Sequence, residues 1–252
     1  MLELGLLATA AFLAGLVDAI AGGGGLVQLP ALLAVFPEAP VATLFGTNKG
    51  ASVWGTAMAA SAYARRVALS RALLGGALPA ALAAAWLGAR SVALLPTHIV
   101  RPAVLTGLVL VAAYTFLRPA LGSESGARRP PASELWLGAA LGAGIGFYDG
   151  IFGPGTGTFL VFALVRGFGH DFLTASAHAK LINLATNLGA LGFFIPRGYF
   201  WWQVALAMAL ANVAGAFAGS RLAVHGGAPL VRRVFLSVVC MLIVKLVLDL
   251  LP

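Results

Sequence analysis

The chain has 252 residues, of which 60% are hydrophobic and 10% are charged, and its mean hydropathy is +0.96. Soluble domains carry about 25% charged residues, so this composition excludes an ordinary water-soluble fold and predicts a polytopic membrane protein. The net charge is +8, but most arginines stand between apolar segments and not in basic clusters with aromatic residues. Such arginines indicate membrane orientation, and no nucleic-acid partner is expected.

Ten apolar segments form two halves, residues 1–117 and 135–252, on either side of a hydrophilic linker at 118–134 that we expect in the cytoplasm. The first segment begins with Glu3 and has no Lys or Arg, so we interpret it as a retained span and not a signal peptide. The predicted segments are Leu4–Ala21, Leu26–Phe36, Val41–Ala64, Ala72–Leu95, Ile99–Leu117, Leu135–Phe152, Phe159–Val165, Phe172–Ile195, Tyr199–Val224 and Leu230–Leu250.

The two halves align without a gap at one constant offset, the spacing from Gly15 to Gly146. This offset pairs Asp18 with Asp149, Lys49 with Lys180, and the glycines after each aspartate with one another. Matches among Ala and Leu mean little in so apolar a chain, but charged residues are rare here. Their coincidence therefore indicates an internal duplication.

The arginines also predict how the halves are oriented. Three groups can be placed together in the cytoplasm: Arg65, Arg66 and Arg71; Arg118, Arg128 and Arg129; and Arg221, Arg232 and Arg233. Equivalent loops of the two halves then lie on opposite sides of the membrane. We therefore expect an all-α integral membrane protein of eight to ten helical segments, with inverted repeats of about five segments each. Four crossings per half, which would make the repeats parallel, stay open.

A glycine-rich junction follows the first segment of each half. Four successive glycines, or Gly-Pro-Gly-Thr-Gly, cannot easily continue a helix, and unwound backbone at membrane depth must be buried or line a cavity. We therefore predict a broken helix in each half, whose new N-terminus offers N–H groups to an anion. Close helix packing alone is the alternative. The residues concerned are Gly22, Gly23, Gly24 and Gly25 in one copy and Gly153, Gly155, Thr156 and Gly157 in the other.

Asp18, Asp149, Lys49 and Lys180 are ionisable groups inside apolar segments, where such groups are costly and usually functional. Each aspartate is expected either to carry a coupling proton or to have a structural role, in which it caps the glycine junction or pairs with a lysine. Each lysine is expected to attract an anion or to neutralise the aspartate of its own half, with snorkelling to the headgroups as the alternative.

Polar residues accompany both lysines and predict a hydrogen-bonding wall along a cavity. They are Thr47 and Asn48 beside Lys49, and His178, Asn183 and Asn187 near Lys180. No Cys or His spacing suggests zinc or haem, no Walker motif is present, and no nucleophilic triad stands out. We therefore expect no cofactor, no bound metal and no enzymatic activity.

The segments Asp18-Ala19-Ile20-Ala21-Gly22-Gly23-Gly24-Gly25 and Gly46-Thr47-Asn48-Lys49 resemble the TauE/SafE family of sulfite exporters, and the likeness covers nearly the whole chain. The second half departs from this pattern at His178-Ala179-Lys180. The resemblance implies multi-pass transport in the bacterial inner membrane of sulfite, a sulfonate or a related small organic anion. It does not specify the anion, since substrates vary within the family.

These features together predict a secondary transporter, as an exporter, that works by alternating access around a midplane site between the repeats. Proton coupling is an option that the two aspartates leave open. A passive anion channel is the nearest alternative, and an intramembrane enzyme using His178, Asp149 and Lys180 is a more distant one. The expected partners are the anionic substrate and the lipid bilayer, and homo-oligomerisation stays open.

Overall fold

The computed structural model describes residues 2–94 and 130–250, and within them every regular element is an α-helix, as the sequence predicts. The predicted segment at 99–117 and most of the linker lie outside the described residues. Helix α9 bends at Gly227, where φ is +62°, between the two apolar segments predicted there. The helices are α1 (Leu2–Ala21), α2 (Gly25–Val35), α3 (Val41–Ala64), α4 (Arg71–Ala93), α6 (Pro131–Ile151), α7 (Thr156–Phe168), α8 (Phe172–Phe194) and α9 (Trp202–Leu250).

The helix boundaries recur at the offset found in the sequence. Helices α7, α8 and α9 begin at the positions equivalent to the starts of α2, α3 and α4, since 156 − 25, 172 − 41 and 202 − 71 all equal 146 − 15. The recurrence has a local cause at the glycine junctions, which interrupt the helices at equivalent positions of both halves. A glycine junction precedes α2 and α7, and a short connection containing a proline precedes α3. The duplicated sequence therefore forms the same series of helices twice.

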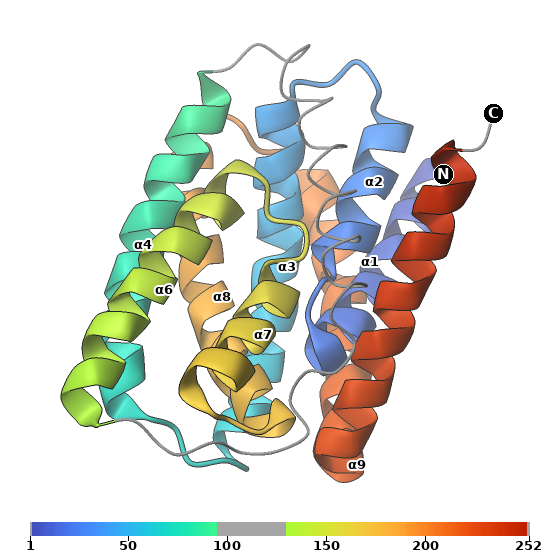
Figure 1. Cartoon of the computed structure of the whole chain (residues 1–252). Coiled ribbons are helices and arrows are strands. Elements are labelled where there is room, and N and C mark those ends of the chain that lie inside the picture. The colour runs from blue at the N-terminus through green and yellow to red at the C-terminus, as the bar shows by residue number, and fades with distance from the viewer. Residues whose placement is uncertain (1, 95–129, 251–252) are drawn as a thin grey trace.

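Helices of the two halves interleave (Figure 1). Helix α4 packs along α6 on one flank, and α1 packs along α9 on the other. Between the flanks, α3 and α8 contact each other, while α3 also packs on α9 and α4 on α8. In the view of Figure 1, α1 runs downward from the N-terminus and α6 runs upward. The largest helix–helix interfaces among the described helices therefore all join one half to the other.

Glycines bring these flanking helices into backbone contact. A Cβ atom added at Gly142 or Gly146 of α6 would lie 2.3 or 2.6 Å from the carbonyl oxygen of Ala77 or Ala81 of α4. On the other flank, a Cβ at Gly215 of α9 would lie 2.0 Å from a carbonyl oxygen of α1. Small residues at membrane helix interfaces allow this close approach, which strengthens van der Waals contact.

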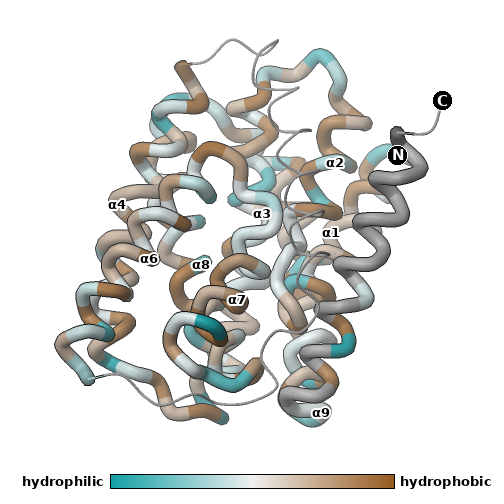
Figure 2. The backbone as a smooth tube through the Cα atoms, viewed as in Figure 1, coloured by the Kyte–Doolittle hydropathy of each residue, from teal (hydrophilic) through white to brown (hydrophobic). Residues whose placement is uncertain are grey.

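Polarity is distributed as expected for a protein in lipid. Large apolar side chains are exposed on the outer surfaces of α1, α4, α6 and α9, among them Leu13, Leu87, Trp136 and Leu210. Both lysines of the repeat are buried instead. Figure 2 shows that most strongly hydrophilic positions lie near helix ends and connections. By length and hydropathy, three described helices can cross a membrane: Glu3–Ala21, Arg71–Ala93 and Trp202–Gly227.

The close contact between α4 and α6 predicts that replacing two nearby glycines of α6 by alanine has different effects on the melting temperature. Gly142→Ala places a methyl group into the backbone of α4 and should lower the melting temperature of the protein in detergent. Gly144→Ala, where a Cβ would meet nothing within 4 Å, should leave it unchanged or raise it slightly, because Ala favours a helix by about 1 kcal/mol over Gly. Equal melting temperatures for the two variants would contradict this account of the interface.

Candidate functional site

The two glycine junctions lie against each other at the centre of the molecule. Helix α1 ends at Ala21 and is followed by Gly22 and Gly23, whose φ angles are +77° and +101°. A Cβ on Gly22 would lie 2.4 Å from the carbonyl carbon of Gly157, and one on Gly157 would lie 2.7 Å from Cα of Gly22. Both positions therefore require glycine, Gly22 for its left-handed backbone as well as for space.

The second junction has the same backbone character. Gly153 and Gly155, which separate α6 from α7, have φ angles of +81° and +80°. On the facing side, a Cβ on Gly25 would contact Pro154 at 3.3 Å. The first turns of α2 and α7 start at these junctions, and the first turn of any helix leaves N–H groups without an intrahelical acceptor. Such N–H groups favour negative charge nearby.

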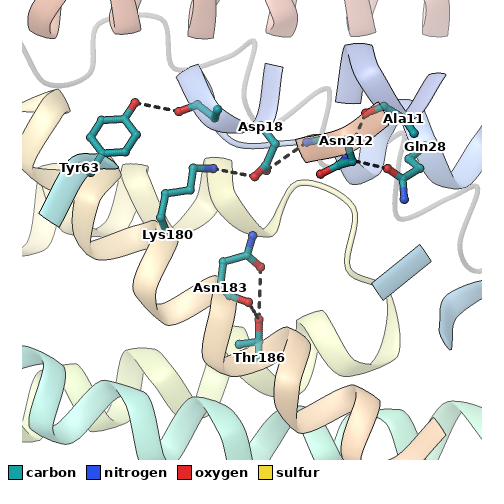
Figure 3. A network of polar contacts seen from close by, with 10 residues as sticks. Ala11, Asp18, Gln28, Tyr63, Lys180, Asn183, Thr186 and Asn212 are labelled. Carbon is teal, nitrogen blue, oxygen red and sulfur yellow. Dashed lines mark hydrogen bonds and ion pairs between the residues drawn. The ribbon is translucent and has the colours of Figure 1, made fainter. Parts of the chain in front are cut away.

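Two ion pairs cross between the halves. Lys49 of α3 binds the Asp149 carboxylate of α6, and Lys180 of α8 binds Oδ2 of Asp18 in α1 at 2.9 Å (Figure 3). The expectation that each lysine neutralises the aspartate of its own half is therefore wrong. The exposed fractions of Lys49 and Lys180 are only 5% and 1%, so neither snorkels. The duplication instead produces a reciprocal exchange, because helices of the two halves interleave.

Each aspartate also holds the glycine junction that follows it. Asp149 Oδ1 accepts a hydrogen bond of 2.6 Å from the Thr156 hydroxyl at the start of α7. Asp18 Oδ1 accepts a longer one, 3.3 Å, from the backbone N–H of Gly24. Each carboxylate thus connects its own junction to a lysine of the other half. The two pairs together carry no net charge.

A pocket opens where these elements meet. Including its mouth, the empty space is about 400 Å³, which suits a small molecule. Both junctions, α3, α8 and α9 contribute to its wall. The lining residues are Asp18, Gly23, Gly24, Gly25, Asn48, Lys49, Ser52, Thr56, Asp149, Gly153, Gly155, Thr156, Gly157, Asn183, Asn187 and Asn212.

Two amide atoms in this wall have no hydrogen-bond partner among the described residues. Asn48 Oδ1 and Asn187 Nδ2 are buried, and the side chains that carry them are 6% and 2% exposed. An unsatisfied buried polar atom costs about 1–3 kcal/mol, so native structures seldom keep one without a reason. A ligand that satisfied both would need a hydrogen-bond donor for Asn48 Oδ1 and an acceptor for Asn187 Nδ2.

Most of the residues that the sequence singled out surround the pocket, but four do not line it: Gly22, Thr47, His178 and Lys180. Gly22 lies in the contact between the junctions, and Lys180 sits behind Asp18. Tyr63 lies on the same side of Asp18, where its hydroxyl donates to the carbonyl oxygen of Ala19 (Figure 3).

Thr47 and His178 each accept a hydrogen bond from a backbone N–H group outside the pocket, and they do so in equivalent ways. The Thr47 hydroxyl accepts a hydrogen bond from the N–H of Trp201 at 3.1 Å. His178 Nε2, at the equivalent position of the second half, accepts one from the N–H of Ser70 at 2.9 Å. Each therefore ties its helix to the residue just before a helix of the other half. Contacts of this kind could not be told from ligand contacts in the sequence.

Sequence reasoning missed three lining residues, Ser52, Thr56 and Asn212. The signal for two of them was present, because Ser52 and Thr56 occupy the positions equivalent to Asn183 and Asn187. Asn212 was hidden among apolar residues of α9. Its Nδ2 donates to Gln28 Oε1 at 3.0 Å and to the carbonyl oxygen of Ala11 at 3.1 Å (Figure 3).

The described residues contain no group of three or more His, Cys, Asp or Glu side chains that could hold a metal ion. One titratable group outside the helices has a shifted pKa. Burial raises the pKa of Asp171, but hydrogen bonds from the N–H groups of Leu173 and Thr174 and from the Thr174 hydroxyl outweigh burial and lower it. Asp171 thereby caps α8 as a carboxylate.

Apolar outer surfaces, buried charges and a polar pocket between interleaved repeats define a helical membrane protein with an internal polar pocket. The chain belongs to the TauE/SafE family of sulfite exporters, whose family model matches residues 7–246. Proteins of this family are membrane transporters by name, in agreement with the resemblance found in the sequence.

Curated relatives cover almost the whole chain. It is 38% identical over 249 residues to the probable membrane transporter protein ORF9 of Sinorhizobium sp, covering 98% of this chain and 93% of that one. It is 37% identical over 254 residues to the probable membrane transporter protein YfcA of Escherichia coli K12, with 98% and 91% covered. A probable membrane transporter protein of Haemophilus influenzae is 32% identical, with 94% and 92% covered. No solved structure matches the chain.

The crossed pairs predict strong coupling between Lys49 and Asp149. Lys49→Met leaves a buried carboxylate without its cation, and breaking such a pair costs about 3–5 kcal/mol. We therefore expect a large fall in melting temperature in detergent. The double variant Lys49→Met with Asp149→Asn removes both charges and should recover most of the loss. If the double variant is as unstable as the two single effects added together, the pair does not stabilise the fold as described.

Proposed function

We propose that this protein is a secondary transporter, an exporter of a small anion such as sulfite, a sulfonate or a related organic anion. The pocket between the two glycine junctions is the proposed binding site. One observation carries the proposal: two buried lysine–aspartate pairs, two helix starts and two unsatisfied amides converge on one small cavity formed by both halves. Family membership and the names of the relatives support transport as the class of activity.

The chemistry of the wall favours an oxyanion. Lys49 supplies a positive charge, and the starts of α2 and α7 supply backbone donors. Asn187 Nδ2 is a free donor, while Ser52 and Thr56 offer hydroxyl groups. A compact anion with several oxygens can accept from these donors at the same time. An extended apolar molecule would leave them unsatisfied.

The arrangement of the halves supports alternating access. We propose that they are inverted repeats, because α1 and α6 run in opposite directions in Figure 1 and the arginine distribution favours the same arrangement. Interrupted helices that meet at a central site are the usual design of inverted-repeat carriers. Rocking of one half against the other would expose the pocket first to one side and then to the other. The bilayer concerned is proposed to be the bacterial inner membrane.

The test is transport by purified protein in proteoliposomes, with sulfite, methanesulfonate and acetate as probes. Wild type should carry at least one of them with saturating kinetics. Lys49→Met with Asp149→Asn, chosen because its fold should be stable, should lower kcat/KM by about ten- to a hundredfold, as expected for the loss of a charged contact. Ser61→Ala, on the exposed face of the same helix, is the control and should transport normally.

Three outcomes would overturn the proposal in different ways. Normal transport by the double variant would show that the anion does not bind in this pocket. Ohmic current without saturation or counterflow would instead establish the alternative, a passive anion channel. Absence of flux for every probe would contradict transport of small oxyanions altogether.

A further inference from the structure

The pocket's charge balance constrains how an anion can bind. Lys49 and Lys180 are each already paired with an aspartate, so the four groups sum to zero. Adding an anion to this site would leave one negative charge without compensation in surroundings of low dielectric constant, which is costly. Uptake of one proton by an aspartate restores the balance, because it releases the positive charge of the partner lysine. An anion and a proton therefore bind together more favourably than the anion alone.

The two aspartates are not equally suited to take up that proton. The Asp149 side chain is 1% exposed, and both its oxygens are engaged, one by Lys49 and one by Thr156. The Asp18 side chain is 16% exposed, and one of its two bonds is the long contact with Gly24. Asp18 is thus more open to water in the pocket and less firmly held.

The two lysines also differ in their access to the pocket. Here the partner of the less exposed aspartate is the one that lines the pocket. Lys49 lines the pocket, whereas Lys180 is buried behind Asp18 and does not. An anion in the pocket can contact Lys49 directly. Lys180, once Asp18 is neutral, contributes an unpaired positive charge from behind the wall.

We infer that Asp18 carries the proton that accompanies each anion, and that Lys49 contacts the anion itself. This assignment rests on the proposed function. The charged and titratable groups that face Asp18 are Lys180 from α8 and Tyr63 from α3, with the Lys49–Asp149 pair across the pocket. Helices α2 and α7 present glycine backbone to it, and α9 packs on this part of α1 through glycine and alanine.

The experiment compares Asp18→Asn with Asp149→Asn in proteoliposomes, using whichever probe anion wild type carries. Wild type should accumulate a monoanion about tenfold per unit of pH gradient, as one proton per anion requires. An imposed membrane potential should not change this, because the step is electroneutral. Asp18→Asn, whose side chain stays neutral, should lose pH-driven accumulation while anion counterflow remains measurable. Asp149→Asn frees Lys49 to hold the anion more tightly but leaves the proton site at Asp18, so it should keep pH-driven accumulation and lower KM for the anion.

The outcomes separate this assignment from the proposed function. If wild type carries the anion but ignores the pH gradient, transport stands and proton coupling falls. If Asp18→Asn still accumulates the anion, or if Asp149→Asn shows the selective loss, the roles are assigned to the wrong aspartates. Melting temperatures of both variants identify any loss that comes from unfolding.

A separate observation concerns the hydrogen bonds by which Thr47 and His178 each connect their helix to a backbone N–H group of the other half, which we call ties. His178 Nδ1 lies 2.8 Å from the carbonyl oxygen of Thr174, to which it can only donate. Nε2, which accepts from the N–H of Ser70, must then be the unprotonated nitrogen of a neutral ring. A protonated ring would place a hydrogen on Nε2 against the N–H of Ser70. The hydroxyl of Thr47 at the equivalent position has no such dependence.

Charged groups surround His178 on several elements. Glu134 at the start of α6 accepts from the Ser70 hydroxyl, and Asp171 caps the start of α8. The ring of His170, in the connection before α8, stacks on that of His178 with centroids 4.7 Å apart. Burial has the largest effect and, like the Ser70 N–H, favours a neutral ring, whereas the Thr174 carbonyl and the two carboxylates favour a positive one. The tie therefore holds at higher pH and is lost as the pH falls.

We propose that His178 makes the tie between α8 and the α3–α4 connection pH-sensitive, whereas the tie at Thr47 is not. Ser70 lies among Arg65, Arg66 and Arg71, the arginines expected in the cytoplasm. Only that side of the protein would then loosen on acidification. This proposal does not depend on the identity of the substrate.

Hydrogen exchange of the protein in lipid nanodiscs tests it without transport. After correction for the intrinsic effect of pH, protection of the Ser70 amide should fall at least tenfold between pH 7.5 and 4.5, since burial keeps the ring neutral below the usual range of histidine. The Trp201 amide is the internal control and should not change. His178→Thr should make Ser70 protection independent of pH, whereas Glu134→Gln should keep the dependence. Constant protection of Ser70 in wild type, or its loss in Glu134→Gln alone, would overturn the proposal.

Discussion

The crossed ion pairs are the interaction on which the rest of the structure depends. Lys49 and Lys180 can be buried only because each meets a carboxylate, and that carboxylate comes from the other half of the chain. A buried charge without a partner would cost several kcal/mol, so the halves are stable only when interleaved. The same requirement places the second glycine junction beside Lys49 and the first beside the Asp18–Lys180 pair. Fold and site therefore have one physical origin.

The glycine junctions must meet two conflicting requirements. Backbone at membrane depth must be hydrogen-bonded, yet a binding site needs backbone donors that are free. Here Asp18 and Thr156, with Asp149 behind it, satisfy part of each junction, and glycines of both junctions line the pocket. Glycine is needed at Gly22 because its backbone is left-handed and Gly157 lies directly against it. A side chain at Gly22 or at Gly157 would collide with the backbone of the other.

Duplication gives the molecule near-symmetry, and divergence between equivalent positions removes it locally. Thr47 and His178 make the same backbone tie, but only one of them can titrate. Asn48 and Ala179 occupy equivalent positions, yet only Asn48 brings an amide to the pocket. The substitutions between the copies therefore make the two sides of the pocket chemically different.

The sequence by itself determined the membrane class, the all-helical fold, the duplication and its offset, because composition and local helix breakers depend on neighbouring residues only. It also identified most residues of the pocket, since charges and amides are rare in apolar segments. Tertiary structure alone decided which lysine meets which aspartate, because the pairing depends on how the halves interleave. It likewise distinguished Asn48, which lines the pocket, from its neighbour Thr47, which accepts a hydrogen bond from the backbone N–H of Trp201. Adjacent residues on a helix point in different directions, and only the packing around them decides what each one meets.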